Sequence, residues 1–157
     1  MGDFMQDKTI KLYYNELEFG ISGYERYRKV EDDSWANVIL KVCNDTIKFE
    51  NCSFDIMSCE VDELRDRISE FLNKKMKNYA CYKPTEEAFK VRFYPKGDEY
   101  GIYYEGLNSK KLLESPNIEI LVYPTDKIGA LDTVGVSFIL EEDDIKRLYK
   151  YLIEITK

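Results

Sequence analysis

The chain of 157 residues contains no histidine. Histidine is the usual general base near neutral pH and the commonest transition-metal ligand, so its absence excludes a catalytic triad and a histidine-based zinc site. The sequence also lacks a glycine-rich phosphate loop, a nucleophile elbow and an H-E-x-x-H motif. We therefore expect a protein that is not an enzyme and that uses no metal and no cofactor.

Long apolar runs are also missing. No stretch approaches the roughly 18 apolar residues of a membrane span, so we expect no membrane contact. The start, Met1–Lys8, carries polar and acidic side chains with no apolar run after it, unlike a signal peptide. Gln6 stands where myristoylation requires serine or threonine. These absences favour a cytoplasmic protein with a frayed segment at residues 1–7.

Cysteine is sparse and scattered. The four cysteines show no C-x-x-C spacing, and they are Cys43, Cys52, Cys59 and Cys81. We expect reduced thiols that pack as small hydrophobic groups. With 44% hydrophobic and 14% aromatic residues, the chain can bury about two thirds of its unfolded surface as one domain, 1–157, without a disulfide.

Positive charge is in deficit, and the formal net charge is −7. This charge opposes phosphate backbones at long range, so we expect no direct contact with nucleic acid. A basic protein partner fits the charge better. The oligomeric state does not follow from the composition.

The chain is organised around residues 35–76, where short strands precede an amphipathic helix. Alternation over Ala36–Val42 predicts a half-buried strand. The apolar parity changes between Phe49 and Phe54, so we expect a bulge or tight turn at Asn51–Ser53. Apolar residues then recur at helical spacing, and they are Val61, Leu64, Ile68, Phe71, Leu72 and Met76. Lys74, Lys75 and Lys77 are expected to close this helix, as its dipole favours.

A second copy of this plan spans residues 117–155. Ile118–Val122 and Val134–Leu140 alternate as strands, and a helix is expected to start near Glu141. Its apolar stripe is Ile145, Leu148, Leu152 and Ile155. Four residues of the first half have the same relative positions as four of the second: Glu60, Asp62, Glu63 and Leu64 correspond to Glu141, Asp143, Asp144 and Ile145. Duplication and the commonness of strand-strand-helix units both remain open as explanations.

Two further segments alternate. Ile10–Ile21 predicts a hairpin or one bent strand, and Phe89–Glu105 predicts a hairpin with a turn at Pro95–Gly97. Tyr94, with Tyr103 and Glu105, forms either an exposed cross-strand cluster or half-covered packing. The tyrosine-rich, charged segment 24–34 is read as a loop, either a contact surface or a solvated connection.

Carboxylates cluster at three places, at Glu31–Asp33, at Glu60–Glu63 and at Glu141–Asp144. Such clusters can divide acid from base duty or hold a divalent metal. The last two clusters stand at expected helix starts, where negative charge is favoured for stability alone. The spacings match no calcium loop, and we favour the structural interpretation.

These elements predict an α+β fold. We expect a largely antiparallel, twisted sheet with two amphipathic helices packed on one face, and two strand-strand-helix halves that are candidates for a pseudo-repeat. Strand order cannot be read from the pattern.

The order of features resembles the small bacterial immunity proteins of the WapI type. The resemblance covers residues 35–155 and rests on four features of the chain. They are Trp35 opening the strand Ala36–Val42, the E-V-D-E-L helix start Glu60–Leu64, the central hairpin Phe89–Glu105, and the closing strand and helix Val134–Ile155. The chain departs from the family pattern in the tyrosine-rich segment before Trp35 and in the loop Pro124–Asp132, which leaves the toxin's identity open.

This resemblance implies a bacterial cytoplasmic protein that binds and neutralises a cognate toxin, commonly a nuclease domain. An acidic protein would associate rapidly with a basic nuclease. The expected toxin-binding residues are Tyr24, Arg26, Tyr27, Glu31, Asp32, Asp33, Asp98, Glu99 and Tyr103. Two alternatives stay open: a small-ligand or regulatory binding module with a tyrosine-lined pocket, and a carboxylate-based enzyme that uses a divalent metal.

Overall fold

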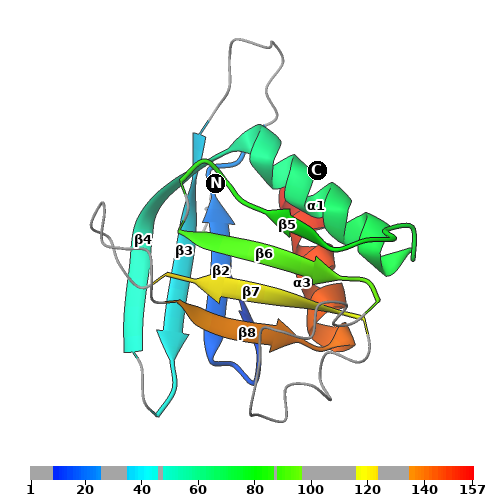
Figure 1. Cartoon of the computed structure of the whole chain (residues 1–157). Helices are drawn as coiled ribbons and strands as arrows, with labels where there is room; N and C mark the ends of the chain where they lie inside the picture. Colours follow the sequence, from blue (N-terminus) through cyan, green and yellow to red (C-terminus); the bar gives the residue numbers. More distant parts are fainter. Residues whose placement is uncertain (1–8, 26–34, 46–47, 87, 97–115, 124–134) are drawn as a thin grey trace.

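The structure is a computed structural model and describes residues 9–25, 35–45, 48–86, 88–96, 116–123 and 135–157. In chain order, its elements are β1 (Thr9–Leu12), β2 (Leu17–Ser22), β3 (Trp35–Cys43), β4 (Lys48–Met57), α1 (Ser58–Leu72), β5 (Ala80–Tyr82), β6 (Phe89–Tyr94), β7 (Asn117–Val122), β8 (Val136–Leu140) and α3 (Glu142–Ile155). Figure 1 shows their arrangement.

The strands form two antiparallel sheets of four, ordered β1-β2-β3-β4 and β5-β6-β7-β8. Strands of the second sheet run across those of the first (Figure 1), as in an orthogonal sandwich. Phe19 of β2 meets Phe89 of β6 edge to face, with ring centroids 5.7 Å apart, so the inner faces share one core. The expected α+β class is confirmed. The strands are divided between two sheets rather than one, because each sheet's apolar face needs a cover and the other sheet provides it.

The two helices pack where their apolar stripes predict. In α1 the residues Val61, Leu64 and Ile68 are buried. The ring of Phe71 in α1 packs against that of Phe93 in β6, with the ring centroids 6.1 Å apart. In α3 the buried residues are Ile145, Leu148, Tyr151 and Leu152. Both helices lie on the same side of the molecule and contact each other (Figure 1). They therefore close the side of the sandwich that the sheets leave open.

Among the described residues, each half of the chain has four antiparallel strands followed by a helix. The unit is therefore longer than the expected strand-strand-helix unit. The matching acidic residues of the two halves also differ in position. Glu60 is the third residue of α1, whereas Glu141 is the N-cap residue of α3. The two carboxylates consequently have different roles at their helix starts.

The expected bulge is present between β3 and β4. Val38 pairs with Phe54, but Leu40 pairs with Asn51, so one residue of β3 lies opposite two of β4. The segment from Ile10 to Ile21 is a hairpin, the first of the two forms that the pattern allowed.

The prediction for the end of α1 was wrong. The helix ends at Leu72 with Asn73 as its C-cap, and its last turn carries no basic residue. Lys74 follows in the left-handed region, at φ 60°, and Lys75 and Lys77 lie beyond it. The lysines are therefore past the helix, because the left-handed residue turns the chain away before they can join its last turn.

Tyr94 does not belong to an exposed cluster. It is 1% exposed, and its ring lies 5.3 Å from that of Tyr79 between centroids. Other expectations lie outside the described residues: the frayed segment 1–7, the returning strand of the central hairpin with Tyr103 and Glu105, and the loop Pro124–Asp132. Val134 lies outside them as well, and β8 begins at Val136.

Candidate functional site

A cleft of about 1200 Å³ lies where the β1–β2 turn, the end of α1 and the start of α3 meet. Apolar side chains contribute to its lining, among them Phe71, Leu72, Met76, Ile139 and Leu140. Small-ligand pockets usually measure roughly 300–1,000 Å³, so this cleft is large enough for a segment of another chain as well as for a small molecule.

The β1–β2 turn at the cleft has an unusual backbone. Tyr13, Tyr14 and Asn15 are all left-handed, with φ values of 53°, 55° and 66°. Left-handed backbone costs a residue with a side chain roughly 1–2 kcal/mol, so the turn must be held by its surroundings. The N–H of Glu16 donates to the carbonyl of Tyr13 at 2.9 Å, which closes the turn.

Two contacts fix Tyr13 and leave its neighbour outside. The N–H of Tyr13 donates to Oδ2 of Asp144 at 3.0 Å, and its ring meets Phe138 edge to face at 5.3 Å between centroids. Tyr14, the next residue, is 74% exposed, the highest value among the large hydrophobic residues that the structure describes. The turn therefore presents the aromatic side chain of Tyr14 at the rim of the cleft, where its ring meets that of Tyr13 edge to face at 5.2 Å between centroids.

The start of α3 forms the acidic side of the cleft. Glu141, Glu142 and Asp143 are exposed and line it. Lys146 donates a hydrogen bond to Glu142 at 2.9 Å, and this bond holds the pKa of Glu142 below its usual value. The hydroxyl of Tyr14 donates to Glu141 at 3.5 Å, and the negative charge of Glu141 raises the pKa of Tyr14. At neutral pH the rim therefore offers carboxylates beside a neutral phenol.

Basic side chains also line the cleft. Lys74 and Lys77, which follow α1, and Lys96, which follows β6, are exposed and line it. The cleft is therefore lined by both signs of charge, with carboxylates from α3 and ammonium groups from the segments after α1 and β6. Lys74 is near enough to Glu142 to help lower the pKa of that carboxyl. A ligand that spans it would meet both signs of charge around an apolar floor.

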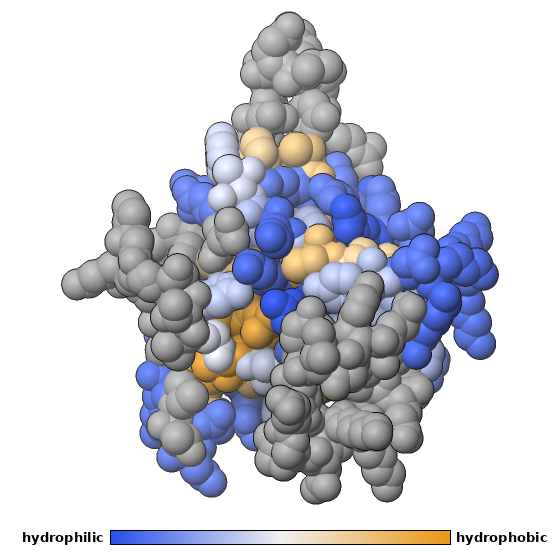
Figure 2. All heavy atoms as spheres, viewed as in Figure 1, coloured by the Kyte–Doolittle hydropathy of each residue, from blue (hydrophilic) through white to orange (hydrophobic). Residues whose placement is uncertain are grey.

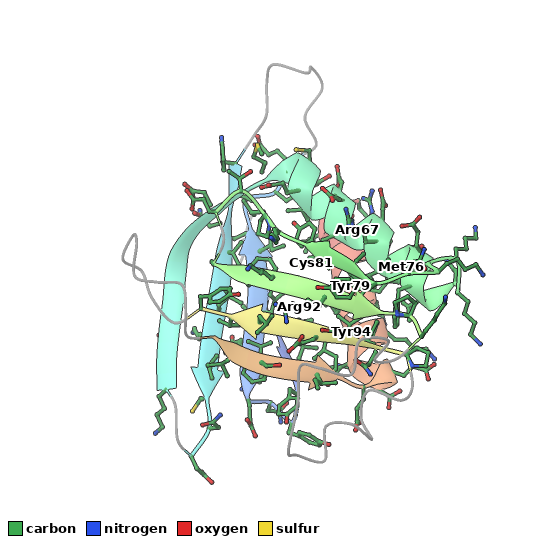
Figure 3. The ribbon with its side chains drawn as sticks, viewed as in Figure 1. Arg67, Met76, Tyr79, Cys81, Arg92 and Tyr94 are labelled. Carbon is green, nitrogen blue, oxygen red and sulfur yellow. The ribbon has the colours of Figure 1, made fainter. Side chains whose placement is uncertain are left out.

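A second polar cluster lies on the outer face of the second sheet. Glu119 of β7 is 1% exposed and accepts hydrogen bonds from the hydroxyls of Tyr94, at 3.3 Å, and Ser137. Arg92 of β6 lies 3.6 Å from it as an ion pair. Figure 3 shows Arg92 and Tyr94 on the ribbon of β6 near Tyr79. The carboxylate already has hydrogen-bond and charge partners on β6 and β8, so it joins the strands together and is not available as a free catalytic base.

The electrostatics of Arg92 agree with this structural role. Burial lowers the pKa of the Arg92 guanidinium. The charge of Glu119 and the neighbouring tyrosines raise this pKa by more than burial lowers it, so the net shift is upward. Arg92 therefore stays cationic and compensates the buried carboxylate.

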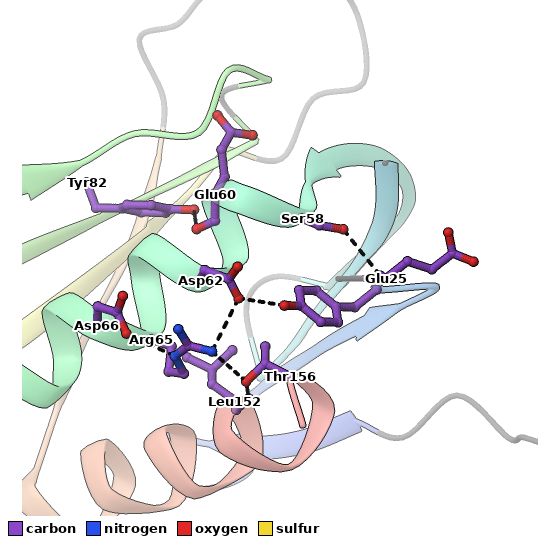
Figure 4. Close-up of polar contacts among 10 residues, drawn as sticks. Glu25, Ser58, Glu60, Asp62, Arg65, Asp66, Tyr82, Leu152 and Thr156 are labelled. Carbon is purple, nitrogen blue, oxygen red and sulfur yellow. Dashed lines mark hydrogen bonds and ion pairs between the residues drawn. The ribbon is translucent and has the colours of Figure 1, made fainter. Parts of the chain in front are cut away.

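The acidic start of α1 is also engaged in structural contacts. The Tyr24 hydroxyl donates to Asp62 at 2.7 Å, and Arg65 donates to Asp62 at 3.3 Å and to the Thr156 hydroxyl at 3.0 Å (Figure 4). Glu60 accepts from the N–H of Thr85 at 2.7 Å. These bonds tie α1 to the end of β2, to the segment after β5 and to the end of α3.

Of the expected toxin-binding residues, the structure describes Tyr24. It is half-buried and held by Asp62, so it is part of the framework in this structure. The others lie outside the described residues, and they are Arg26, Tyr27, Glu31, Asp32, Asp33, Asp98, Glu99 and Tyr103. The expected set of contact residues therefore stays a prediction.

Sequence reasoning missed Tyr14 as a site residue. Its alternation with Ile10 and Leu12 indicated a strand, whereas the structure places it in the turn between β1 and β2. Asn15, which tolerates left-handed backbone, was the local signal of a turn. Glu141 and its neighbours were recognised as an acidic helix start, but not as the rim of a cleft.

Three observations bear on other classes of function. Among the described residues, no group of three or more cysteine, aspartate or glutamate side chains could hold a metal ion. No helix in the described ranges has both the length and the apolar character needed to cross a membrane. Cys43, Cys59 and Cys81 carry thiols and form no disulfide with one another.

Comparison with other proteins adds no family. No protein-family model, curated protein or solved structure matches the chain.

Proposed function

We propose that this protein is a non-enzymatic inhibitor of the immunity type, which binds a basic toxin in the bacterial cytoplasm, in keeping with the WapI-type resemblance. The contact surface in this proposal is the acidic rim, which we define as Tyr14, Glu141, Glu142 and Asp143. A nuclease domain is the favoured partner, because nucleases that bind phosphate backbones carry the basic surface that an acidic rim complements.

The exposure of Tyr14 is the observation that supports this proposal most strongly. A tyrosine that is 74% exposed contributes little to the core, yet the strained turn fixes its backbone and the ring of Tyr13 packs against its ring. Tyrosines are enriched among the few residues that carry most of the energy of protein interfaces. A side chain that is already positioned loses less entropy on binding, which strengthens association.

The carboxylates of the rim would act mainly on the rate of association. Glu141, Glu142 and Asp143 lie within three consecutive positions on the exposed start of α3. Their charge adds to the net −7 of the chain and would steer a basic partner towards Tyr14. Salt should then slow association strongly while changing dissociation little.

The test is co-purification and binding kinetics with the protein encoded by the gene just upstream. Tyr14→Ala should weaken binding by more than tenfold, as expected for an interface residue worth about 2 kcal/mol. Ile153→Ala, at another exposed apolar residue, is the matched control and should leave the affinity unchanged. The charge comparison is Glu142→Gln against Glu154→Gln, which removes the same charge from the opposite end of α3.

The proposal fails under clear conditions. It is wrong if the chain does not bind the protein encoded by the upstream gene and does not protect cells that express that protein. It is also wrong in its placement of the surface if Tyr14→Ala and Ile153→Ala bind equally well.

The cleft supports a second candidate, a small-ligand or regulatory binding module. Lys74, Lys77 and Lys96 line it together with apolar side chains and could hold an acidic ligand with an apolar body. A ligand that binds only the folded state must raise the melting temperature, so a thermal-shift screen separates the two functions. A hit that is lost in a Lys74→Ala, Lys77→Ala double variant and kept in Tyr14→Ala would favour this candidate.

A further inference from the structure

The two sheets differ in how their edges are protected. An exposed edge strand pairs readily with another chain, and natural edges are blocked by charge, by a bulge or by shortness. Edge strand β1 carries the exposed Lys11, and edge strand β4 carries Lys48, Glu50 and a bulge. Edge strand β5 has three residues. The fourth edge strand, β8, has five residues, Val136–Leu140, and contains no charge, no proline and no glycine.

The surroundings of β8 would suit an incoming strand. In the described part of the chain, β8 pairs with β7 on one side only. Ser137 is exposed, and Val136 and Ile139 are half-buried. Figure 2 shows an apolar area at the level of β7 and β8. Ile139 also lines the cleft, so the edge of the sheet leads into the cleft and then to Glu141.

We propose that β8 is a docking edge, to which an extended basic segment of the partner adds as a further strand of the second sheet. In this mode, backbone hydrogen bonds supply affinity and alternate side chains supply specificity. The inference rests on the proposed function for the identity of the partner, and it specifies how that partner binds.

The charge around β8 selects the occupant. Glu141 directly follows β8, and the exposed Glu142 and Asp143 come next, so lysine or arginine side chains on the added strand would find carboxylates within a few residues. A second copy of this chain would bring its own net charge of −7 to the same place. Electrostatic repulsion therefore disfavours a homodimer through β8 and favours a basic segment.

The probe for this inference is a short synthetic peptide in which lysine and valine alternate. Amide hydrogen exchange of the full chain, with and without the peptide, reports whether outward N–H groups of β8 become protected. The matched peptide is N-methylated on both edges, so it keeps its charge and side chains but has no backbone N–H groups with which to pair. The matched protein variants are Ile139→Lys, on the docking edge, and Ile153→Lys, on α3.

We expect the plain peptide to protect β8 amides, the N-methylated peptide to protect none, and Ile139→Lys to bind about tenfold more weakly, a change of 1.4 kcal/mol. Ile153→Lys should bind normally. Equal binding of both peptides, or binding without β8 protection, would overturn the inference even if Ile139→Lys failed to fold. Protection of β8 in a dimer without peptide would assign the edge to a second copy and would also overturn it.

The same hydrogen-exchange experiment with the partner protein in place of the peptide distinguishes this inference from the proposed function. If the partner binds and β8 amides stay unprotected, strand addition is wrong and the inhibitor function stands. If the peptide protects β8 while the neighbouring gene's product does not bind, the docking edge stands and the identity of the partner is wrong.

Discussion

The backbone N–H of Tyr13 donates to the carboxylate of Asp144 across 131 residues of sequence, at a distance of 3.0 Å. This bond attaches the tip of the β1–β2 hairpin to the first turn of α3. It joins the two halves of the chain at the place where the acidic rim and the cleft meet. The position of Tyr14 therefore depends on a residue from the other end of the chain.

Removing the Asp144 carboxylate should loosen this attachment. Asp144→Ala leaves the Tyr13 N–H without its acceptor, and we expect a loss of about 1–3 kcal/mol in the free energy of unfolding. Asp143→Ala removes the same charge from the same helix start at an exposed neighbour and corrects for the helix dipole. Arg147→Ala corrects for the ion pair that Asp144 also forms with Arg147 at 3.2 Å. Urea unfolding measures the three variants. Equal losses would show that the bond to Tyr13 contributes nothing beyond charge.

At the left-handed turn, glycine should be more stabilising than alanine, the reverse of the order at an ordinary strand position. Glycine tolerates the φ of 55° at Tyr14, whereas alanine does not, so Tyr14→Gly should be more stable than Tyr14→Ala by roughly 1 kcal/mol. Both variants should lose partner binding, because both lack the aromatic ring. At Asn37, exposed on β3, the order should reverse, since glycine weakens an ordinary strand position. Thermal unfolding of the four variants tests the comparison, and the same order at both positions would contradict it.

The hydroxyl of Tyr151 forms hydrogen bonds with backbone groups at the end of the first hairpin. Its hydroxyl accepts the N–H of Ile21 at 2.8 Å and donates to the carbonyl of the same residue at 3.4 Å, just beyond the last β1–β2 pair, Thr9 and Gly20. Tyr151→Phe keeps the ring and leaves two buried backbone groups without this partner, which should cost about 1–3 kcal/mol. Tyr149→Phe, on a half-buried residue of the same helix, is the control and should change the stability little. Urea unfolding in which the two variants match would contradict this role for the hydroxyl.

Local patterns predicted the parts of the fold that depend on one element at a time. The stripes through Leu64 and Leu148 identified both helices because burial repeats with the helical period. The bulge beside Leu40 followed from a change of parity. The division into two sheets did not follow, because alternation shows that a strand has an apolar face and does not show which strands lie beside it. That choice is made by contacts such as Phe19 with Phe89, far apart in sequence.

The candidate site was less accessible to sequence reasoning, for the same reason. Tyr14 alternates with Leu12 as a strand residue would, and its left-handed conformation is held by Asp144 from the opposite end of the chain. The acidic run Glu141–Asp143 was visible, but negative charge at a helix start is explained by the dipole alone. The acidic run lines a cleft only because the β1–β2 hairpin tip lies beside it, and the sequence does not show that neighbour.

Tyr82 makes a prediction about pH. Burial, followed by the negative charge of Glu60, raises its pKa above the ordinary value of 10.0. In the folded protein the phenol therefore stays neutral where the unfolded chain already ionises. Its contribution to stability is complete below about pH 10 and is lost as the pH rises above that value, by up to about 1.4 kcal/mol for each pH unit.

The variant Tyr82→Phe tests this alkaline loss. At neutral pH it should be less stable by about 1 kcal/mol, because the hydroxyl donates to the carbonyl of Glu60 at 2.7 Å. As the pH rises above about 10, the wild-type protein should lose stability faster than the variant, since phenylalanine has no proton to release on unfolding. Urea unfolding over this pH range should therefore show the two stabilities converging. Parallel curves would mean that the phenol of Tyr82 ionises as readily in the folded protein as in the unfolded chain, and that its burial does not oppose the charge.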